Sequence, residues 1–282
     1  MIFTEEDFKA LNCSPRWYVE APVYCYSNVI TDEAVEAWNE MANGIKLKKI
    51  TERKIEVQFV LPELTNGNNL FIKATMLAIS FVVSLNVGTF GHFWWAPPAW
   101  PFRFTKLFDF KNKINVQIKI QKQDDKQWSH KALTKQDMTR VAQVFSAITP
   151  LDETYFRLYS IGATLLETEN RDFNFYTEVF SNFYRLIERF VKVEILKRKK
   201  GDLNLKIIKK VLSSLSIDQD IVNVLDGLTQ VRSRDAMHAY GIEKEITFEE
   251  AGKCKILCDL MLFKFTEQEF DKYDPAIQNA GL

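Results

Sequence analysis

The stretch TKQDMTRVAQVFSAI, at residues 134–148, marks the position where the pattern of the chain changes. Thr134 is suited to the N-cap of a helix, and Pro150 is suited to stop one. Between them, apolar side chains recur at intervals of three and four residues, namely at Met138, Val141, Ala142, Phe145 and Ile148. This is the spacing of one helical face, so the stretch predicts the first of a series of helices.

Before this stretch the pattern is that of strands. Apolar residues alternate with other side chains in two segments, at Ile55, Val57, Phe59 and Leu61 and at Ile114, Val116, Ile118 and Ile120. A period of two over such lengths predicts half-buried strands. The segment TNGNN, residues 65–69, predicts a turn, and residues 32–41 predict a short helix. We therefore expect an antiparallel sheet in the N-terminal part.

The most apolar part of the sequence is residues 74–102, which contain no Lys, Arg, Asp or Glu. A run of this length is sufficient to cross a membrane. However, polar residues such as Ser80 and Ser84 interrupt the run, Gly88 and Gly91 break it, and no basic cluster flanks it. We therefore interpret it as buried strands and expect no membrane span. A peripheral membrane protein that uses this segment is an alternative.

After Pro150 the sequence predicts more helices. The expected segments are residues 151–169, 172–200 and 205–215, a fifth helix from a capping box at Ser216 and Gln219 to Gly241, and a last helix opened by a capping box at Thr247 and Glu250. The helix at 172–200 carries Phe180, Phe183, Ile187, Phe190 and Val191 on one side. Such an apolar side is typical of the central helix of a bundle.

These patterns predict an α+β protein, with an antiparallel strand-rich domain followed by an all-α bundle. We expect the strand-rich domain at residues 1–130, a connecting helix at 131–150, the bundle at 151–272 and a tail at 273–282. For the N-terminal domain we expect a role in sensing a trigger or recognising a target.

Composition restricts the class of protein. The 282 residues include 37 basic and 37 acidic ones, so the global charge does not demand a polyanionic partner. The four cysteines form no CxxC pair, which fits a reducing compartment, and with three histidines they supply too few ligands for a standard zinc site. Cys254 and Cys258 are four apart in the last helix, so we expect core-facing thiols. The first ten residues lack the apolar core of a signal peptide, so we expect a cytoplasmic protein. We also expect no metal and no cofactor.

The segment VRSRDAMHAYG, residues 231–241, combines the residue types that chemistry on phosphates requires. On a continuous helix, Arg232 lies near the centre of an apolar stripe formed by Ile221, Val224, Leu225 and Leu228. A guanidinium there requires a partner, because an unpaired buried charge is costly. One interpretation is a structural ion pair with Glu188. The other is an anion site in which Arg232 or Arg234 binds a phosphate and His238 moves protons.

An Arg, a small polar residue and a His near the end of a bundle helix resemble the R-x(4–6)-H signature of HEPN domains. The sequence NFYRLIERFVKVEILK, residues 182–197, is similar to the long first helix of this family, and LTQVRSRDAMHAYG, residues 228–241, is similar to its motif helix. The similarity covers roughly residues 150–270. It says nothing about the N-terminal domain.

The resemblance implies a metal-independent endoribonuclease of a toxin system or of defence against phage. Arg232 and His238 match the motif with five intervening residues, Ser233 fills the polar position, and Arg234 is an additional cation. The commonest spacing is four, at which Ser233 stands in place of the arginine, so both arginines remain candidates for the catalytic one. Asp235, Tyr240 and Glu188 are expected to support the site.

Cleavage of RNA by its own 2′-hydroxyl needs a base, an acid and positive charge at the phosphorane. Because one His cannot fill both proton roles at once, we expect a homodimer with the motif helix at its two-fold axis. The expected partners are RNA and, through the N-terminal domain, a protein trigger or antitoxin. The alternative function is a non-catalytic binding module in which the Arg and His side chains form a structural network.

A basic segment supports the first hypothesis. Residues 185–210 contain ten Lys or Arg and three Asp or Glu, including Lys197, Arg198, Lys199 and Lys200, which we expect to bind RNA. The alternative is a solvated helix end whose cations offset the helix dipole. Trp94, Trp95 and Trp100 lie in a Pro-rich segment that we interpret as a buried corner rather than a base-stacking surface. His92 and His130 are expected to be structural or exposed.

Overall fold

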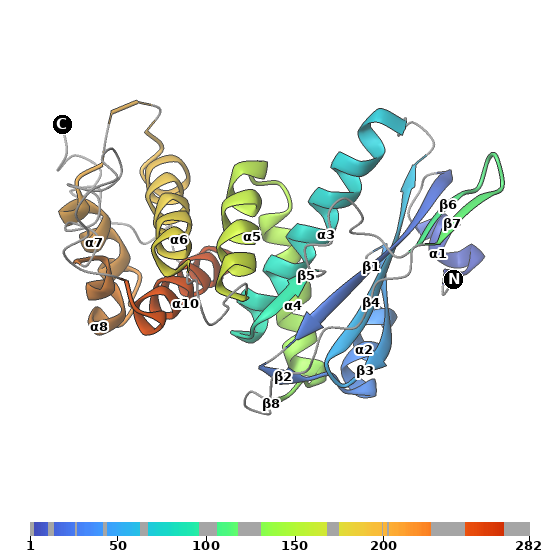
Figure 1. The fold of residues 1–282 in the computed structure, drawn as a ribbon, viewed down its shortest axis with the longest axis horizontal. Coiled ribbons are helices and arrows are strands. Elements are labelled where there is room, and N and C mark those ends of the chain that lie inside the picture. The colour runs from blue at the N-terminus through green and yellow to red at the C-terminus, as the bar shows by residue number, and fades with distance from the viewer. Residues whose placement is uncertain are drawn as a thin grey trace. The chain divides into compact units, whose positions relative to one another are not determined.

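The computed structural model describes residues 3–10, 14–25, 27–41, 44–62, 67–95, 106–117, 131–167, 175–198, 200–201, 203–226 and 246–267. The chain divides into two compact units, Met1–Pro150 and Leu151–Leu282 (Figure 1). The first unit contains an antiparallel sheet with helices, and the described part of the second unit is helical. The predicted α+β class is confirmed.

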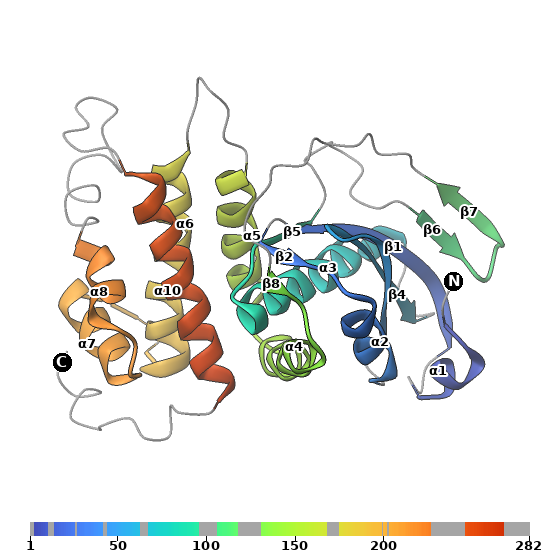
Figure 2. The ribbon, with the colours of Figure 1, turned by 90° about the horizontal axis from the view of Figure 1, so that it is seen from below.

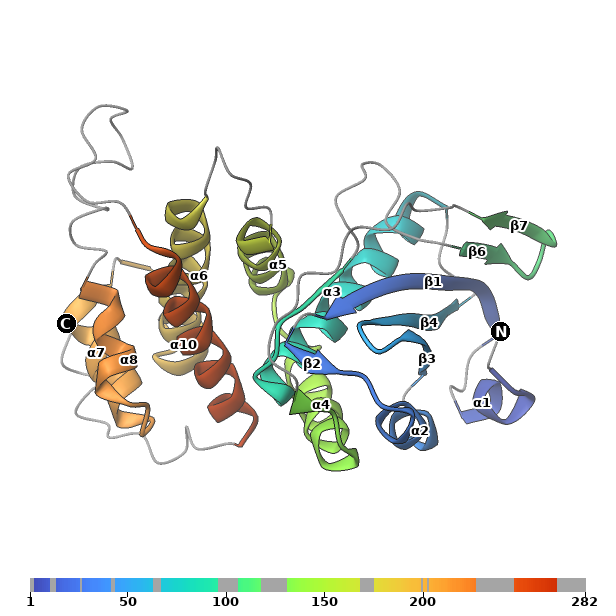
Figure 3. The ribbon, with the colours of Figure 1, turned by 60° about the horizontal axis from the view of Figure 1, so that its bottom comes forward.

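The sheet of the first unit is built around the long strand β1. Figure 3 shows β7, β6, β1, β4 and β3 in succession, and β5 pairs with the other half of the β1 edge that β6 occupies. All these pairs are antiparallel. The strands are β1 (Pro15–Cys25), β3 (Ile45–Thr51), β4 (Lys54–Pro62), β5 (Phe93–Trp95), β6 (Lys106–Asp109) and β7 (Ile114–Gln117). The short strands β2 (Asn28–Val29) and β8 (Lys131–Ala132) form a separate parallel pair.

Two helices connect the strands in a recognisable order. Apart from β2, which lies outside this sheet, the chain runs β1, α2, β3, β4, α3, β5, and these strands lie in the order β3-β4-β1-β5. This is the element and strand order of the ferredoxin-like β-α-β-β-α-β unit. The described helices of the first unit of the chain are α1 (Glu5–Ala10), α2 (Asp32–Glu40), α3 (Gly67–Thr89) and α4 (Lys135–Ile148). Figure 2 shows α2, α3 and α4 on the same side of the sheet.

Alternation of side chains explains which face of the sheet is covered. Val19, Ala21 and Val23 of β1 are fully buried, as are Val57 and Phe59 of β4. Successive strand residues point to opposite faces, so these side chains share the inner face. The predicted strand around residues 55–61 is confirmed as β4, and the predicted short helix at 32–41 is confirmed as α2. For the second predicted strand, β7 covers residues 114–117 only, Ile114 is 55% exposed, and residues 118–120 lie outside the described part of the chain.

The interpretation of residues 74–102 as buried strands is wrong for residues 74–89, which belong to α3. The polar residues that interrupt the run are compatible with a helix, because their side chains bond to carbonyls of the preceding turn. Ser84 Oγ donates to the Ser80 carbonyl, and Thr89 Oγ1 donates to the Leu85 carbonyl, both at 2.7 Å. Only Phe93–Trp95 of the predicted segment form a described strand, β5.

The helix α3 is long and apolar enough to span a membrane, and 67% of its most apolar part is buried within the protein. It lies against α4, β5 and the central strands. At Gly88 the two helices approach so closely that an added Cβ would lie 2.9 Å from the backbone of Val141. These contacts are those of a core helix.

The helix α4, expected as a connection between domains, belongs to the first unit. Thr134 caps it as predicted, and Asp137 completes a capping box by accepting from the Thr134 backbone. Its buried side chains include Met138, Val141 and Ile148. Because these side chains pack against α3 and α2, the helix is a layer of this unit rather than a linker.

The second unit is a helical bundle in which α6 lies between α5 and α10. Its elements are α5 (Glu153–Glu167), α6 (Tyr176–Phe190), the π-helix η1 (Val191–Ile195), α7 (Leu205–Ser214), α8 (Gln219–Val222), the 3₁₀-helix η2 (Asn223–Asp226) and α10 (Phe248–Thr266). The predicted apolar side of the third helix, from Phe180 to Val191, is buried. The capping box at Thr247 and Glu250 is also confirmed.

Two expectations for this unit are wrong. The helix expected to reach residue 200 ends at Phe190 and continues only as η1. The N-cap of α8 is Asp218, whose side chain accepts from the Asp220 backbone, whereas Ser216 has a φ of 58°. Because η2 replaces the α-helix at Asn223–Asp226, the phase of about 100° per residue that placed Arg232 on the apolar stripe does not hold along these four residues.

Candidate functional site

The predicted catalytic residues lie outside the described residues. Arg232, Ser233, Arg234 and His238, together with the supporting residues Asp235 and Tyr240, all fall within residues 227–245. We call residues 227–245 the motif segment. The structure defines the elements on either side of it, which are η2 before the motif segment and α10 after it.

The last described residue before the motif segment is held by helix α7. Asp226, the last residue of η2, accepts from Lys209 Nζ of α7 at 2.7 Å. Gln219 of α8 accepts from Ser213 Oγ of α7, also at 2.7 Å. These two polar contacts and the buried Leu225 hold α8 and η2 against the bundle, directly before the motif segment.

The motif segment ends at the first turn of α10. Ile246 is 3% exposed, and Thr247 caps the helix. Phe248 packs edge-on against Tyr176, the first residue of α6, with ring centroids 5.7 Å apart. The two ends of the motif segment therefore both join the same bundle, because α10 contacts α6, α8 and η2.

The four residues expected to bind RNA do not share one environment in the structure. Lys197 Nζ lies 3.9 Å from Glu194, and Lys200 is exposed, whereas Lys199 lies outside the described residues. Lys197 has a φ of 53° and follows η1. The Arg198 backbone then donates to the Lys192 carbonyl, so the basic run turns sharply away from the helix. Glu188, the expected partner of Arg232, is half-buried on α6.

A polar cluster that sequence reasoning did not identify surrounds η1. The Tyr155 hydroxyl donates to Glu194 at 3.0 Å, and Arg189 lies over the Tyr155 ring and pairs with Asp152 at 3.3 Å. Burial and the neighbouring Glu194 carboxylate raise the pKa of Tyr155. Tyr155 therefore stays protonated and acts as a hydrogen-bond donor. The sequence does not reveal this cluster. Glu194 lies in a π-helix, so the spacing of an ordinary α-helix does not predict which way its side chain points.

A second polar cluster is buried between α5 and α10. The Tyr159 hydroxyl donates to Asp259, whose other oxygen accepts from Lys255 Nζ at 2.7 Å. Lys255 and Asp259 are 5% and 1% exposed. Burial, and then the charge of Asp259, raise the pKa of Tyr159 well above its usual value. The cluster is sealed from solvent, so it serves the packing of α10 rather than chemistry on a ligand.

The described thiols are not suited to nucleophilic chemistry. Cys254 and Cys258 are fully buried against α6, as the sequence predicts, and burial raises the pKa of both. In the first unit, burial raises the pKa of Cys25 to about 11. Because the thiolate is the nucleophile, these groups are inert at neutral pH. Within the residues that the structure describes, no three His, Cys, Asp or Glu side chains group to hold a metal.

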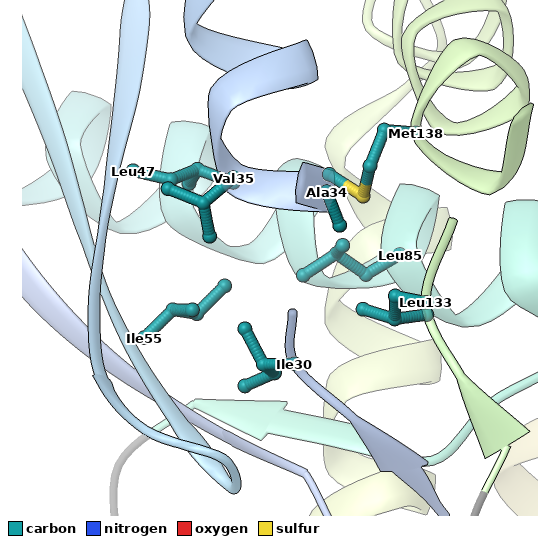
Figure 4. Close-up of a pocket in the computed structure, with 8 residues that line it drawn as sticks. All are labelled: Ile30, Ala34, Val35, Leu47, Ile55, Leu85, Leu133 and Met138. Atoms are coloured by element: carbon teal, nitrogen blue, oxygen red, sulfur yellow. The ribbon is translucent and has the colours of Figure 1, made fainter. Parts of the chain in front are cut away.

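A small apolar cavity lies among the described residues of the first unit. Figure 4 shows its lining side chains, which come from both sheet and helices: Ile30, Ala34, Val35, Leu47, Ile55, Leu85, Leu133 and Met138. Its volume of about 10 Å³ has room for roughly one water molecule. A lining without polar atoms holds no water in place, so the cavity is a packing gap.

The aromatic corner of the first unit is buried as expected. Trp94 and Trp95 are 5% and 6% exposed, and the Trp94 ring packs against Tyr24 at 5.3 Å. The His92 backbone donates to Ser27 Oγ, which fixes the start of β5. Trp100 and His130 lie outside the described residues. The part of the corner that the structure describes does not present rings for base stacking.

Comparison of the chain with protein-family models, with curated proteins and with solved structures found no match.

Proposed function

We propose that this protein is a metal-independent endoribonuclease of the HEPN type, in which Arg232 or Arg234 and His238 act on RNA. The observation that carries the proposal is the Arg–Ser–Arg–Asp–x–x–His sequence of the motif segment, which lies between two elements of one helical bundle. The resemblance implies such a bundle. The described helices α5, α6, α7, α8 and α10 are consistent with it.

The flanks of the motif segment support the proposal. Lys209 holds Asp226, so the segment departs beside a helix that also carries Lys206 and Lys210. Positive charge near a phosphate-cleaving site attracts the substrate and stabilises the phosphorane. At the other end, the capped and buried start of α10 gives the segment a rigid anchor.

The proposed chemistry assigns one role to each residue type. The imidazole of His238, whose ordinary pKa is about 6.5, takes a proton from the attacking 2′-hydroxyl in one subunit. The His238 of a second copy donates a proton to the leaving 5′-oxygen. The guanidinium of Arg232 or Arg234 stabilises the negative charge that develops on the phosphorane, and Ser233 supplies a hydrogen bond. A homodimer therefore belongs to the proposal.

The first unit is proposed to regulate the second. A sheet with β3 and β7 as its edge strands suits recognition of a protein trigger or antitoxin. A role in the cytoplasm in defence against phage or as a toxin follows from the resemblance. The second candidate, a non-catalytic binding module, is supported by the half-buried Glu188 on α6, which is placed to neutralise a cation within the bundle.

Expression of the wild type and of His238→Ala tests the proposal. Wild type is expected to slow growth and to fragment cellular RNA, whereas His238→Ala is expected to reduce cleavage by about 10²- to 10⁴-fold. Addition of EDTA to the purified dimer is expected to leave cleavage unchanged. Separate Arg232→Ala and Arg234→Ala variants identify the catalytic arginine.

His92→Ala is the matched control, because His92 belongs to the first unit, where its backbone N–H donates to Ser27 Oγ. It should retain cleavage. A harmless wild type whose purified dimer leaves RNA intact would contradict the nuclease proposal and favour the binding module.

A further inference from the structure

The short helix α1 is stabilised at its start by contacts among its own residues. The Thr4 backbone N–H donates to the Asp7 carboxylate at 2.8 Å, and the Asp7 backbone N–H donates to Thr4 Oγ1 at 3.3 Å. This reciprocal pattern is a capping box. Phe3 and Phe8 flank it as a hydrophobic staple, with nearly parallel rings whose centroids are 6.0 Å apart. The sequence of α1 therefore encodes its helical conformation locally.

Two phenyl rings attach α1 to the sheet. The ring of Phe3 packs edge-on against Tyr18 of β1, with ring centroids 6.3 Å apart, and the ring of Phe8 packs edge-on against Phe110 at 6.1 Å. Phe3 is 6% exposed and shares a buried cluster with Tyr18 and with Val60 of β4. The helix thus covers side chains of at least two strands.

One ion pair joins α1 to a third strand. The Asp7 carboxylate lies 2.8 Å from Lys46 Nζ of β3, which also donates to the Asn39 carbonyl of α2 at 2.8 Å. The side chains on the other side of α1 are exposed, namely Thr4, Glu5, Glu6 and Lys9. The helix is therefore held on the sheet from one side and faces water on the other.

The surface beneath α1 is a row of neighbouring side chains on three strands. Tyr18 of β1 is paired with Val60 of β4 on one side and with Phe108 of β6 on the other. Phe110 packs edge-on against Phe108 at 5.2 Å. Because strand residues alternate between faces, Tyr18 and Val60 lie on the face opposite to the core-facing residues of β1 and β4. We call Tyr18, Val60, Phe108 and Phe110 the aromatic site.

The backbone around the aromatic site is held by contacts that do not involve α1. Pairing of β1 with β4 and with β6 sets the register of the three strands. The Phe110 backbone N–H donates to the Arg16 carbonyl at 2.7 Å, and the Arg16 side chain pairs with Asp109 at 3.3 Å. The strands that form the site therefore stay in place when the helix that covers them leaves.

The helix α1 belongs to the kind of element that opens locally. A helix of six residues is too short to be stable alone in water, so α1 unfolds once it leaves the sheet. Ordering of its backbone costs conformational entropy, which opposes the gain from burial of two phenyl rings. Short segments of this kind open more readily than the strands of a core.

We infer that α1 is a detachable strap, and that the aromatic site beneath it binds a partner segment with the chemistry of α1: two aromatic side chains and a carboxylate on one short helix. The helix seated in the structure defines this chemistry, because Phe3 and Phe8 pack on the site and Asp7 pairs with Lys46 beside it. A protein that presents such a segment displaces α1 and docks on the sheet. The inference goes beyond RNA cleavage, and its tests use no RNA.

Amide hydrogen exchange of the full-length wild type tests the strap. Mass spectrometry of peptic fragments compares residues 3–10 with residues 15–25 of β1 and residues 54–62 of β4. We expect α1 to be protected about 10- to 100-fold relative to an unstructured chain, which corresponds to an open fraction of roughly 1 to 10%. The two strands are expected to exchange at least about 100-fold more slowly than α1.

Binding of a fluorescein-labelled synthetic peptide with the sequence of residues 1–10 tests the site. In the full-length wild type the peptide competes with α1, so its apparent affinity is reduced by the open fraction. In full-length Phe3→Ala/Phe8→Ala the strap no longer competes, and fluorescence anisotropy should show binding tighter by about 10- to 100-fold. This gain in affinity should match the protection factor of α1 within about threefold, because both measure the same open fraction.

Further changes in the Phe3→Ala/Phe8→Ala protein locate the binding. Val60→Asp places a charge in the aromatic site and should abolish peptide binding. Lys46→Gln removes the ion pair with the peptide carboxylate and should weaken binding by roughly 2- to 5-fold. Lys48→Gln is the matched control, because it removes an exposed charge from the same strand, and it should leave binding unchanged. Circular dichroism verifies the fold of every variant.

Two results would each overturn the inference. One is exchange of α1 as slow as that of β1 and β4, and this measurement decides even where the double variant does not fold, since it uses the wild type. The other is failure of the peptide to bind folded Phe3→Ala/Phe8→Ala protein more tightly than the wild type.

Discussion

At the scale of single residues, one cluster of buried polar groups in the second unit centres on Asp259. Its carboxylate accepts from Tyr159 of α5 and from Lys255 of α10, and all three side chains are almost sealed from solvent. Removal of one partner from such a cluster leaves another buried charge or polar group unsatisfied. The geometry therefore predicts unequal effects of mutations at its members.

We expect Asp259→Ala to destabilise the protein by about 3 to 5 kcal/mol, because it breaks the buried ion pair between Asp259 and Lys255. Tyr159→Phe should cost about 1 to 3 kcal/mol, because Asp259 retains Lys255. Urea denaturation measures both. Tyr155→Phe is the control, since its hydroxyl serves the partly exposed Glu194; a loss as large as that of Asp259→Ala would contradict the assignment.

The thiol of Cys25 links stability to pH. Burial raises its pKa from 9.0 to about 11 in the native protein. Between these values the unfolded chain loses the proton and the native protein keeps it, so the free energy of unfolding falls as pH rises from 9 to 11. We expect Cys25→Ala to show a shallower fall than the wild type over this window in urea titrations. An identical slope would contradict the buried position of the thiol.

At the scale of elements, helix packing depends on where glycine stands. Gly88 of α3 faces the backbone of Val141 at a distance that leaves no room for a methyl group, whereas a Cβ at Gly252 of α10 would meet nothing within 4 Å. The same substitution therefore has opposite effects at the two positions. Steric overlap decides the first, and helix propensity decides the second.

We expect Gly88→Ala to destabilise the first unit by about 1 to 3 kcal/mol. Gly252→Ala should stabilise the second unit by up to about 1 kcal/mol. Thermal unfolding followed by circular dichroism measures both shifts. Equal changes of the same sign would contradict the close approach of α3 and α4.

Lys197, two residues after the end of η1, has a conformation that favours glycine. Its φ of 53° lies in the left-handed region, where a Cβ costs roughly 1 kcal/mol. We expect Lys197→Gly to raise the free energy of unfolding by about 0.5 to 1 kcal/mol. Lys197→Ala removes the same charge without relieving the backbone, so it should bring no gain in the same urea titration.

At the scale of the whole molecule, the boundary between the two units follows Pro150. The helix α4 covers α3 and α2 and supplies Met138, Val141 and Val144 to the core of the first unit. A boundary before residue 131 would expose the apolar side of α3 to water. The first unit is therefore complete only with α4.

We expect a fragment of residues 1–150 to unfold cooperatively in urea, because it retains this core. A fragment of residues 1–130 should aggregate or lack a cooperative transition, since α3 loses the helix that covers it. Cooperative unfolding of the shorter fragment would contradict the assignment of α4 to the first unit.

Local patterns determined much of this protein. Alternation at residues 55–61 specifies β4, and spacings of three and four specify α4, α6 and α10, because burial of one face imposes those periods. The capping boxes at Thr134 and Thr247 are equally local, since each is completed within one turn. The motif segment, with Arg232 and His238, is likewise known from the sequence.

Only the tertiary structure decided the remainder. A run that is apolar on every side has no period, so helix and strand could not be distinguished for α3 until its packing between sheet and α4 was seen. The pairing of Lys209 with Asp226 joins two residues 17 positions apart in the sequence. Such contacts leave no local pattern, because packing of the whole bundle sets them.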